Sequence, residues 1–506
     1  MTHLADMLQS TFIVFYLVVL VLLCVYGMHR YLLVALYYRH RHDAPLRAPD
    51  SAEWPSVTVQ LPVFNERYVV WRLLNAIRLL DYPRDRLEVQ VLDDSTDETR
   101  DIVRVAVEEM RREGIDVRCL HRASRDGYKA GALRHGLDHA SGEYIAIFDA
   151  DFVPDPHFLR RVLPHFSDKR IGMVQTRWGY LNRDYSLLTR LQAIYLDAHF
   201  IIEHLTRNRS GCFFNFNGTG GVWRKRCLLD AGNWQLDTLT EDLDISYRAQ
   251  LQGWRFVFAA DTVVPSELPV EVTGFKTQQY RWAKGSIQTA LKLLGSVLRS
   301  SYPRKVKLEA FFHLTNNVSY LLMIFLSLSM YPAMIIRFNM GWRETILLDV
   351  PLLVAATLSV SIFYLTSQQV LFGERWWRQL LYLPFLMGLG IGLSLNNGRA
   401  VLSALFGVDS EFKRTPKHGI EGRRGVWLDK RYVGRIDLMI LGEIFMVMYF
   451  GFSIYFALLN EIYVAIPFLL LFAIGFGYVS LLSLWQAGSR VVAQSIRVPL
   501  QDTVPK

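Results

Sequence analysis

The chain has 506 residues, of which 51% are hydrophobic and 20% are charged, and this composition excludes a disordered chain, a collagen and a disulfide-rich scaffold. Its formal net charge is +9, from 56 Lys and Arg against 47 Asp and Glu. In a chain this apolar, a mild basic excess is typical of basic loops beside membrane-spanning segments, so we expect a lipid bilayer as a partner and no nucleic acid.

The first apolar segment, residues 12–38, is long enough for one helix across a hydrocarbon core about 30 Å thick. No Lys or Arg precedes it, while three arginines follow it closely: Arg39, Arg41 and Arg47. This bias predicts an N-terminus outside and a cytosolic chain after residue 45. We assign residues 1–45 to a transmembrane helix. A cleaved signal peptide is the alternative, but the apolar run is too long and does not end in small residues.

Residues 46–272 contain no apolar run long enough to span a bilayer, and β-rich and amphipathic stretches alternate along them. We expect strands at 57–63, 87–92, 117–120 and 144–148, and helices at 69–80, 97–112 and 130–139. This alternation predicts an α/β domain with a parallel sheet, and such sheets bind ligands at the carboxyl ends of their strands.

Acidic residues lie at two of those strand ends. Asp93 and Asp94 close the second strand, and Asp149 and Asp151 follow the fourth. In a domain without a P-loop or a Gly-x-Gly-x-x-Gly motif, two such pairs suit a nucleotide sugar held with a divalent cation. Mg²⁺ or Mn²⁺ takes carboxylate oxygens and stabilises a diphosphate leaving group. Capping of the following helix explains either pair alone equally well.

Two later motifs carry groups suited to the same chemistry: Thr240-Glu241-Asp242 and Gln278-Gln279-Tyr280-Arg281-Trp282. A carboxylate in a closed site can act as general base toward a sugar hydroxyl. An arginine beside a tryptophan can bind diphosphate while the indole stacks on a sugar ring. The alternatives are an acidic helix N-terminus and an amphipathic helix lying on lipid. We expect interfacial helices over residues 273–312 in either case.

Apolar character returns in the last third of the chain. We expect two transmembrane helices in residues 313–375 and two more in residues 431–487, followed by a cytosolic tail at 488–506. The shorter apolar run within 376–410 has basic residues on both flanks, which favours an interfacial or re-entrant helix. This gives five spanning helices, and six is the competing count.

Taken in order, the motifs resemble the signature of processive glycosyltransferase family 2 enzymes, which include the cellulose, hyaluronan, curdlan and mannan synthases. The signature residues are Asp93-Asp94, Asp149-x-Asp151, Thr240-Glu241-Asp242 and Gln278-Gln279-x-Arg281-Trp282. Blocks between them are most similar to the plant cellulose-synthase-like A branch (mannan and glucomannan synthases) and its bacterial relatives: QVLDDSTD (90–97), GYKAGAL (127–133), FNGTGGVWR (216–224) and SELP (266–269). The resemblance implies a GT-A-like α/β domain between transmembrane helices, one before it and about four after it.

The resemblance also implies roles for individual residues. Those expected to bind the nucleotide sugar are Pro62, Phe64, Glu66, Asp93, Lys129, Asp149, Gln278 and Arg281. Asp151, with Asp149, would hold Mg²⁺ or Mn²⁺, and Asp242, beside Glu241, would be the catalytic base. Those expected to bind the acceptor are Trp282, Asn217, Gly218 and Thr219.

Residues 411–430 resemble the gating loop of bacterial cellulose synthase, a segment that closes over the nucleotide. Phe412, Thr415 and Lys417 occupy the matching positions, while Arg414 stands where that loop has valine. A mobile lid that brings a hydroxyl and an ammonium group to a diphosphate is physically reasonable. A basic cytoplasmic loop is the alternative.

We therefore expect a multi-pass protein of the inner or plasma membrane, with a cytosolic catalytic domain. It would polymerise hexose from UDP-glucose or GDP-mannose into a β-linked polysaccharide and secrete it through its own helices. Four tryptophans could stack sugars there or anchor the membrane interface: Trp223, Trp282, Trp376 and Trp377. A non-processive enzyme making a glycolipid and a transporter with a regulatory domain are the alternatives.

Overall fold

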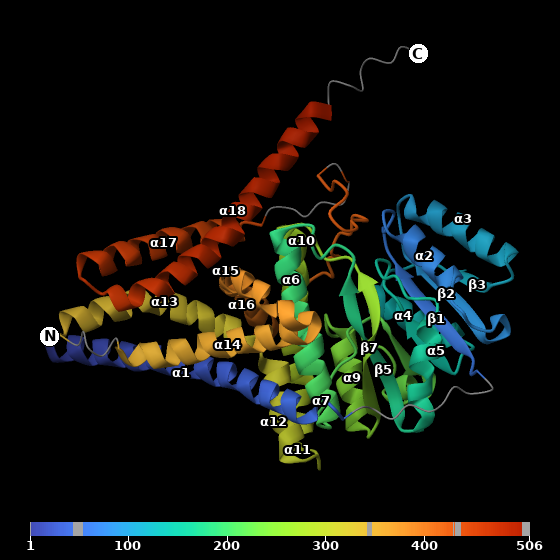
Figure 1. Ribbon diagram of the computed structural model, residues 1–506, viewed down its shortest axis with the longest axis horizontal. Helices are drawn as coiled ribbons and strands as arrows, with labels where there is room; N and C mark the ends of the chain where they lie inside the picture. The colour runs from blue at the N-terminus through green and yellow to red at the C-terminus, as the bar shows by residue number, and fades with distance from the viewer. Residues whose placement is uncertain (1, 44–53, 342–346, 429, 431–436, 498–506) are drawn as a thin grey trace.

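The computed structural model describes residues 2–43, 54–341, 347–428, 430 and 437–497. An α/β domain occupies one end, and long helices from both ends of the chain extend away from it on the other side (Figure 1). Helices α6 (Leu187–Ala198) and α10 (Val272–Thr289) lie between the two parts.

A seven-stranded sheet forms the centre of the domain, in the order β3-β2-β1-β4-β6-β5-β7. Its strands are β1 (Val57–Val63), β2 (Leu87–Asp93), β3 (Asp116–Leu120), β4 (Tyr144–Ile147), β5 (Ile171–Tyr180), β6 (Gly221–Arg224) and β7 (Arg255–Ser266). The first four pair in parallel, as the sequence predicts. The short β6 runs antiparallel to both β4 and β5, so the whole sheet is mixed rather than parallel.

Helices cover both faces of the sheet, so its central strands are buried on both sides, and the polar side chains of β1 and β2 there bond to each other, as Thr58 does to Glu88 and Gln60 to Gln90. All seven residues of β2 are buried, and hydrophobic clusters lie on both sides of the sheet. The domain helices besides α6 are α2 (Val70–Arg78), α3 (Thr99–Arg112), α4 (Tyr128–His139), α5 (Phe158–Val162), α7 (Leu205–Arg209), α8 (Lys225–Asp230) and α9 (Glu241–Leu251).

Trp223 belongs to the hydrophobic core of this domain. It is 0% exposed and packs edge-on against Trp234 and Phe256. The prediction that Trp223 stacks sugars or anchors the interface is therefore wrong.

Five helical segments among the described residues are long and apolar enough to cross a membrane, which fits a multi-pass membrane protein. They are Asp6–His40, Val318–Asn339, Asp349–Leu405, Met439–Leu459 and Tyr463–Ser489. The helices beyond the α/β domain are α1 (Thr2–His40), α11 (Gly295–Arg299), α12 (Arg304–Thr315), α13 (Val318–Asn339), α14 (Asp349–Phe372), α15 (Leu383–Gly392), α16 (Ser394–Leu405), α17 (Met439–Leu459) and α18 (Ile466–Arg497). The third segment includes both a predicted transmembrane helix and most of the 376–410 run that the sequence assigns to an interfacial or re-entrant helix.

The third of these segments is not one straight helix. It breaks after α14 at Gly373, whose φ is 53°, and continues as a 3₁₀ segment, Gly373–Tyr382, before α15 and α16. Trp377 on that segment is 56% exposed. α15 packs on α18 where Gly388 and Gly475 approach closely, and α16 packs on α10. The run that the sequence assigns to an interfacial or re-entrant helix thus forms two short helices between α10 and α18.

Helix α10 is fastened to the long helices by buried polar contacts. Lys276 Nζ lies 2.6 Å from Glu443 Oε1 on α17 and donates to Ser483 Oγ on α18 at 3.0 Å. Asn396 on α16 donates to the Lys276 carbonyl oxygen at 2.9 Å, and Gln486 Oε1 accepts from the Val272 N–H at 2.9 Å. The orientation of α10 therefore depends on three other helices.

Replacing Lys276 with Met should leave the carboxylate of Glu443 buried and unpaired, which costs about 3–5 kcal/mol of stability. We expect a lower thermal midpoint of the detergent-solubilised protein, and the double variant Lys276→Met/Glu443→Leu should recover most of the loss. Arg399→Met is the matched control, since it removes a half-exposed pair with Asp437, worth less than about 1 kcal/mol. Equal midpoints for the two single variants would contradict the assignment.

Candidate functional site

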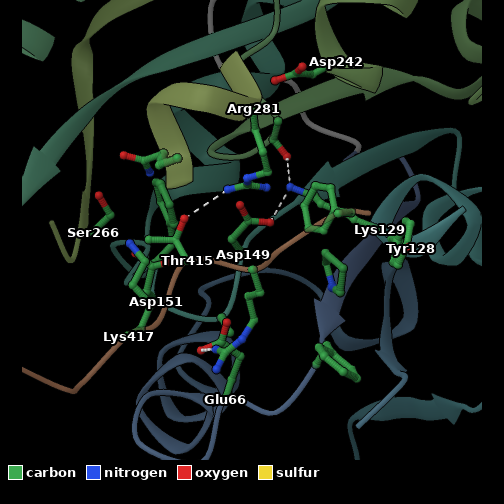
Figure 2. Close-up of a pocket in the computed structure, with 18 of the residues that line it drawn as sticks. Glu66, Tyr128, Lys129, Asp149, Asp151, Asp242, Ser266, Arg281, Thr415 and Lys417 are labelled. Atoms are coloured by element: carbon green, nitrogen blue, oxygen red, sulfur yellow. Dashed lines mark hydrogen bonds and ion pairs between the residues drawn. The ribbon is translucent and has the colours of Figure 1, made fainter. Parts of the chain in front are cut away.

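A cavity of about 190 Å³ opens at the carboxyl ends of β1 and β4. Parts of the chain that are far apart in sequence form its walls: the β1–α2 connection, α4, the residues after β4 and β7, the start of α9, the middle of α10, and residues 412–417 (Figure 2). The residues expected from the sequence that line it are Pro62, Phe64, Glu66, Lys129, Asp149, Asp151, Asn217, Gly218, Glu241, Asp242, Gln278, Arg281, Trp282, Phe412, Thr415 and Lys417. The motifs thus meet in one place.

Two of the expected site residues do not line this cavity. Asp93 is 3% exposed, and its Oδ1 accepts the N–H of Ser95, while Asp94 lines the cavity and pairs with Arg122. Thr219 is also buried, and its Oγ1 accepts the Asp149 N–H at 2.8 Å. In this structure the Asp93 carboxylate binds the chain just after β2, Thr219 binds the backbone of Asp149, and neither side chain is part of the cavity lining.

Lys129 on α4 links the acidic residue after β4 to the glycine loop before β6. Its Nζ lies 2.5 Å from Asp149 Oδ1 and donates to the Gly218 carbonyl oxygen at 2.9 Å. Burial raises the pKa of Asp149, and the ammonium of Lys129 opposes that shift. Gly218 itself has φ +78°, and a Cβ on it would lie 3.1 Å from Asp242 Oδ2 and 3.3 Å from Lys129 Nζ. This position therefore requires glycine.

Glu241 and Asp242 begin α9, where the N-terminal end of the helix dipole favours negative charge. Burial raises the pKa of Glu241. The pKa of Asp242 is raised to about 7, because burial disfavours its carboxylate and the neighbouring Glu241 charge adds to this effect. A carboxylate with a pKa near the working pH is suited to accept a proton in the reaction.

The pair Asp149 and Asp151 has the chemistry of a site for a hard cation. Both offer carboxylate oxygens to the cavity, and each is balanced by an ammonium group in this structure: Lys129 for Asp149 and Lys417, at 2.8 Å, for Asp151. Among the described residues, no three His, Cys, Asp or Glu side chains form a closed metal site. The residues present therefore fit a cation such as Mg²⁺ that takes one or two carboxylates and completes its coordination with substrate phosphate oxygens.

The segment expected to be a gating loop forms one wall of the cavity (Figure 2). Phe412 stacks on Tyr128 with ring centroids 5.5 Å apart, and the Arg281 guanidinium lies 4.3 Å from the Phe412 ring centroid. Arg281 also donates to Thr415 Oγ1 at 3.1 Å. The QxxRW helix and this segment are therefore in direct contact.

Arg414, the residue that departs from the gating-loop pattern, lies 2.6 Å from Glu66. Burial raises the pKa of Glu66 to about 7, although Arg414 acts in the opposite direction. The arginine at this position thus adds a charge pair between the segment and the β1–α2 connection.

The structure also shows a cavity residue that sequence reasoning missed, Arg125. Its guanidinium lies 3.3 Å from the Phe64 ring centroid and 4.9 Å from that of Tyr128. Its place three residues before Tyr128 of the GYKAGAL block was the available signal.

On the side expected to bind the acceptor, Trp282 packs against a buried cluster of Ala193, Leu196 and Leu268. The Asn217 amide lies 3.3 Å from His199 Nε2. Asp242 and Trp282 line the same cavity. Within the described parts of α1, α13, α14, α17 and α18, no residue belongs to the cavity lining. The cavity is therefore built by the α/β domain, α10 and residues 412–417.

Residues 55–285 match the family model described as glycosyltransferase like family 2. These residues form a glycosyltransferase family 2 domain. The chain is 44% identical over 257 residues to glucomannan 4-beta-mannosyltransferase 1 of Oryza sativa subsp. japonica, a match that covers 49% of each chain. Glucomannan 4-beta-mannosyltransferase 1 of Cyamopsis tetragonoloba is 36% identical over 320 residues, 62% of this chain and 61% of that protein. The matches thus span about half, or somewhat more, of the relatives' length.

A solved structure supports the GT-A-like fold. It is the mannosyltransferase PcManGT from Pyrobaculum calidifontis in complex with GDP-Man and Mn²⁺, with a TM-score of 0.53 and 20% sequence identity. The likeness covers 78% of this chain and 99% of that one. The glycosyltransferase domain therefore has the fold that the sequence resemblance implies, with a mixed sheet flanked by apolar helices.

Gly218→Ala should lower incorporation of sugar from a labelled nucleotide sugar more than tenfold, because the new Cβ would press on both Asp242 and Lys129. The matched control is Gly211→Ala, which has a similar φ of +71° but nothing within 4 Å of the added Cβ. This control carries the same backbone strain without the contacts, and it should retain most of the incorporation. Equal losses in the two variants would show that strain alone is responsible.

Proposed function

We propose that this chain is a membrane-embedded, inverting hexosyltransferase that builds a β-linked mannan or glucomannan processively from a nucleotide sugar. The observation that carries the proposal is the convergence of Asp242, Asp151, Arg281 and Trp282 on one cavity. A base, a cation site, a diphosphate-binding arginine and a sugar-stacking ring then lie within reach of one donor and one acceptor.

In this proposal Asp242 removes the proton from a hydroxyl at the non-reducing end of the glycan, and that oxygen attacks the anomeric carbon of the donor. The bond to the nucleotide diphosphate breaks in the same displacement, so an α-linked donor gives a β-linked product. Arg281 and Lys129 offset the negative charge that grows on the diphosphate. Asp149 and Asp151 would hold a divalent cation, which neutralises diphosphate charge when bound.

The donor we favour is GDP-mannose. Both curated relatives described above carry glucomannan 4-beta-mannosyltransferase in their names, and the structure from Pyrobaculum calidifontis contains GDP-Man with Mn²⁺. UDP-glucose remains the second donor to test, since hexose selectivity rests on a few hydrogen bonds. Mg²⁺ and Mn²⁺ both suit the two-carboxylate site.

We further propose that the catalytic domain lies in the cytosol, with the N-terminus outside, and that the product leaves through the chain's own helices. The arginines after α1 support this orientation. The buried contacts of α10 with α16, α17 and α18 support a path beside the helices, since the acceptor residue Trp282 is on α10.

The transporter alternative expects ionisable residues in the spanning helices to serve an ion or substrate path. Two such acids are buried here, and each has a basic partner within 3 Å: Glu443 with Lys276, and Asp349 with Arg337. Paired charges of this kind hold helices together, so they favour a structural role over a path.

The test of the proposed function is incubation of membranes containing the protein with labelled GDP-mannose or UDP-glucose and Mg²⁺ or Mn²⁺. Digestion of the product with linkage-specific hydrolases then identifies the polymer. We expect a long β-linked product from GDP-mannose, and a single sugar in the organic phase would overturn the polymer claim. Asp242→Asn should reduce incorporation by about 10²–10⁴-fold while nucleotide binding stays within twofold of the original.

The raised pKa of Asp242, about 7, predicts a pH dependence of that reaction. Below this value the carboxyl is protonated and cannot act as a base, so incorporation should increase about tenfold per pH unit up to about pH 7 and then level off. The measurement is the initial rate at donor concentrations well below KM, where the rate follows kcat/KM and reports the free enzyme, between pH 5.5 and 8.5 in buffers of constant ionic strength. A rate that does not change over that interval would exclude Asp242 as the titrating base.

A further inference from the structure

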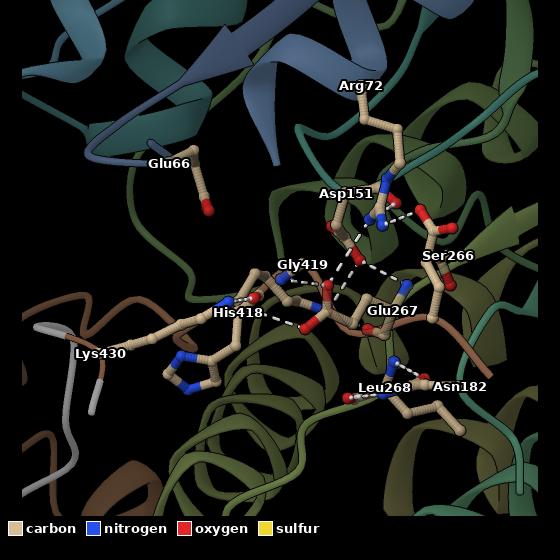
Figure 3. A network of polar contacts seen from close by, with 12 residues as sticks. Glu66, Arg72, Asp151, Asn182, Ser266, Glu267, Leu268, His418, Gly419 and Lys430 are labelled. Carbon is tan, nitrogen blue, oxygen red and sulfur yellow. Dashed lines mark hydrogen bonds and ion pairs between the residues drawn. The ribbon is translucent and has the colours of Figure 1, made fainter. Parts of the chain in front are cut away.

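Glu267 follows directly after β7 and holds the segment at the cavity wall through that segment's backbone. Its side chain is 1% exposed. Its Oε1 accepts the N–H of His418 at 2.8 Å, and its Oε2 accepts the N–H of Gly419 at 2.9 Å (Figure 3). One buried carboxylate thus binds two consecutive amides from a part of the chain some 150 residues away.

The same residue is connected to the expected cation site. The Glu267 N–H donates to Asp151 Oδ2 at 3.1 Å, and Lys417 Nζ donates to that oxygen at 2.8 Å and also to the Glu267 carbonyl oxygen. The Lys417 ammonium therefore sits on the carboxylate that a divalent cation would use. Its position is set by its own bonds and by the anchoring of the next two residues.

The Glu267 carboxylate is buried, so it must be compensated by the groups that surround it. A buried carboxylate is costly unless hydrogen bonds or charges compensate it. Two backbone amides and the Arg72 guanidinium, which lies 3.5 Å from Oε2, supply that compensation. Gly419 has φ +67°, and a Cβ on it would lie 2.7 Å from the Tyr68 carbonyl oxygen, so the chain passes this point with little freedom.

We propose that Glu267 is a positioning residue that fastens residues 417–419 to the cavity edge and thereby holds Lys417 on Asp151 as an internal cation, which a divalent cation must displace. This inference rests on the proposed function for the identity of the cation site. Donor and cation then bind together, because the diphosphate offers the displaced ammonium a new anionic partner. Without donor, Lys417 competes with the cation for Asp151.

The variant Glu267→Gln should change Mn²⁺ binding and donor binding in opposite directions. The amide group can accept from only one of the two backbone N–H groups, since its NH₂ is a donor. The segment should loosen and Lys417 should leave Asp151. We expect donor-free Mn²⁺ to bind about tenfold more tightly, equivalent to about 1.4 kcal/mol, while the KM for the donor rises about tenfold at a kcat changed less than threefold. General destabilisation would weaken both kinds of binding.

The experiment uses the full chain in detergent and measures free Mn²⁺ by electron paramagnetic resonance in the absence of nucleotide. In parallel, mass spectrometry follows the rate of tryptic cleavage after Lys417, which should increase at least fivefold in Glu267→Gln. Glu421→Gln is the matched control: Glu421 is an exposed partner of the same Arg72, at 2.8 Å, and does not contact the segment's amides at the cavity. It should leave Mn²⁺ affinity, cleavage after Lys417 and KM unchanged.

Lys417→Gln provides a second test that does not depend on the folding of the Glu267 variant. It should raise donor-free Mn²⁺ affinity to the same extent, and combining it with Glu267→Gln should add nothing further. Unchanged or weaker Mn²⁺ binding in Lys417→Gln, or unchanged cleavage in a folded Glu267→Gln, would overturn the proposal. If these shifts occur but the unmodified chain transfers sugar from neither donor, the proposed function fails and the anchoring role of Glu267 stands.

Discussion

The site depends on balancing several buried negative charges within one cavity. Glu66, Asp149, Asp151, Glu241 and Asp242 all line it, and burial raises the pKa of four of them. Without nearby cations, these carboxylates would repel one another and could not all stay ionised in a buried site. The compensating charges come from distant parts of the chain: Lys129, Arg281, Arg414 and Lys417. The buried acids can therefore lie together only because the fold brings these distant cations to them.

The acids follow β1 and β4 or begin α9, and the cations come from α4, α10 and the 412–419 segment. β1 and β4 end at the cavity, and the residues after β7 bind the segment that carries Arg414 and Lys417. Helix α10 brings Arg281 to the same place while its Lys276 is paired with Glu443 among the long helices. A displacement of those helices would consequently move Arg281 relative to the acids, which links the membrane part of the molecule to the reaction site.

Under the proposed function, the Lys417 ammonium on Asp151 affects the order in which donor and divalent cation bind. An ammonium that already occupies Asp151 keeps a partly buried carboxylate neutralised before any ligand arrives. The donor's diphosphate then offers the ammonium a stronger anionic partner and leaves the carboxylate to the incoming cation. The cost of exchanging these partners is small because every charge remains compensated throughout.

The sequence by itself determined the local elements and the chemistry of the motifs. Apolar periodicity located β1 to β4, the helices between them and five apolar spans, and residue type identified Asp149, Asp151, Asp242 and Arg281 as functional candidates. Only the tertiary structure decided that β6 is inserted antiparallel, that Asp94 rather than Asp93 faces the cavity, that Trp223 belongs to the core, and that Glu267 holds the wall segment. The reason is that each of these outcomes depends on contacts between residues far apart in the chain, whereas periodicity and residue type report only on neighbours.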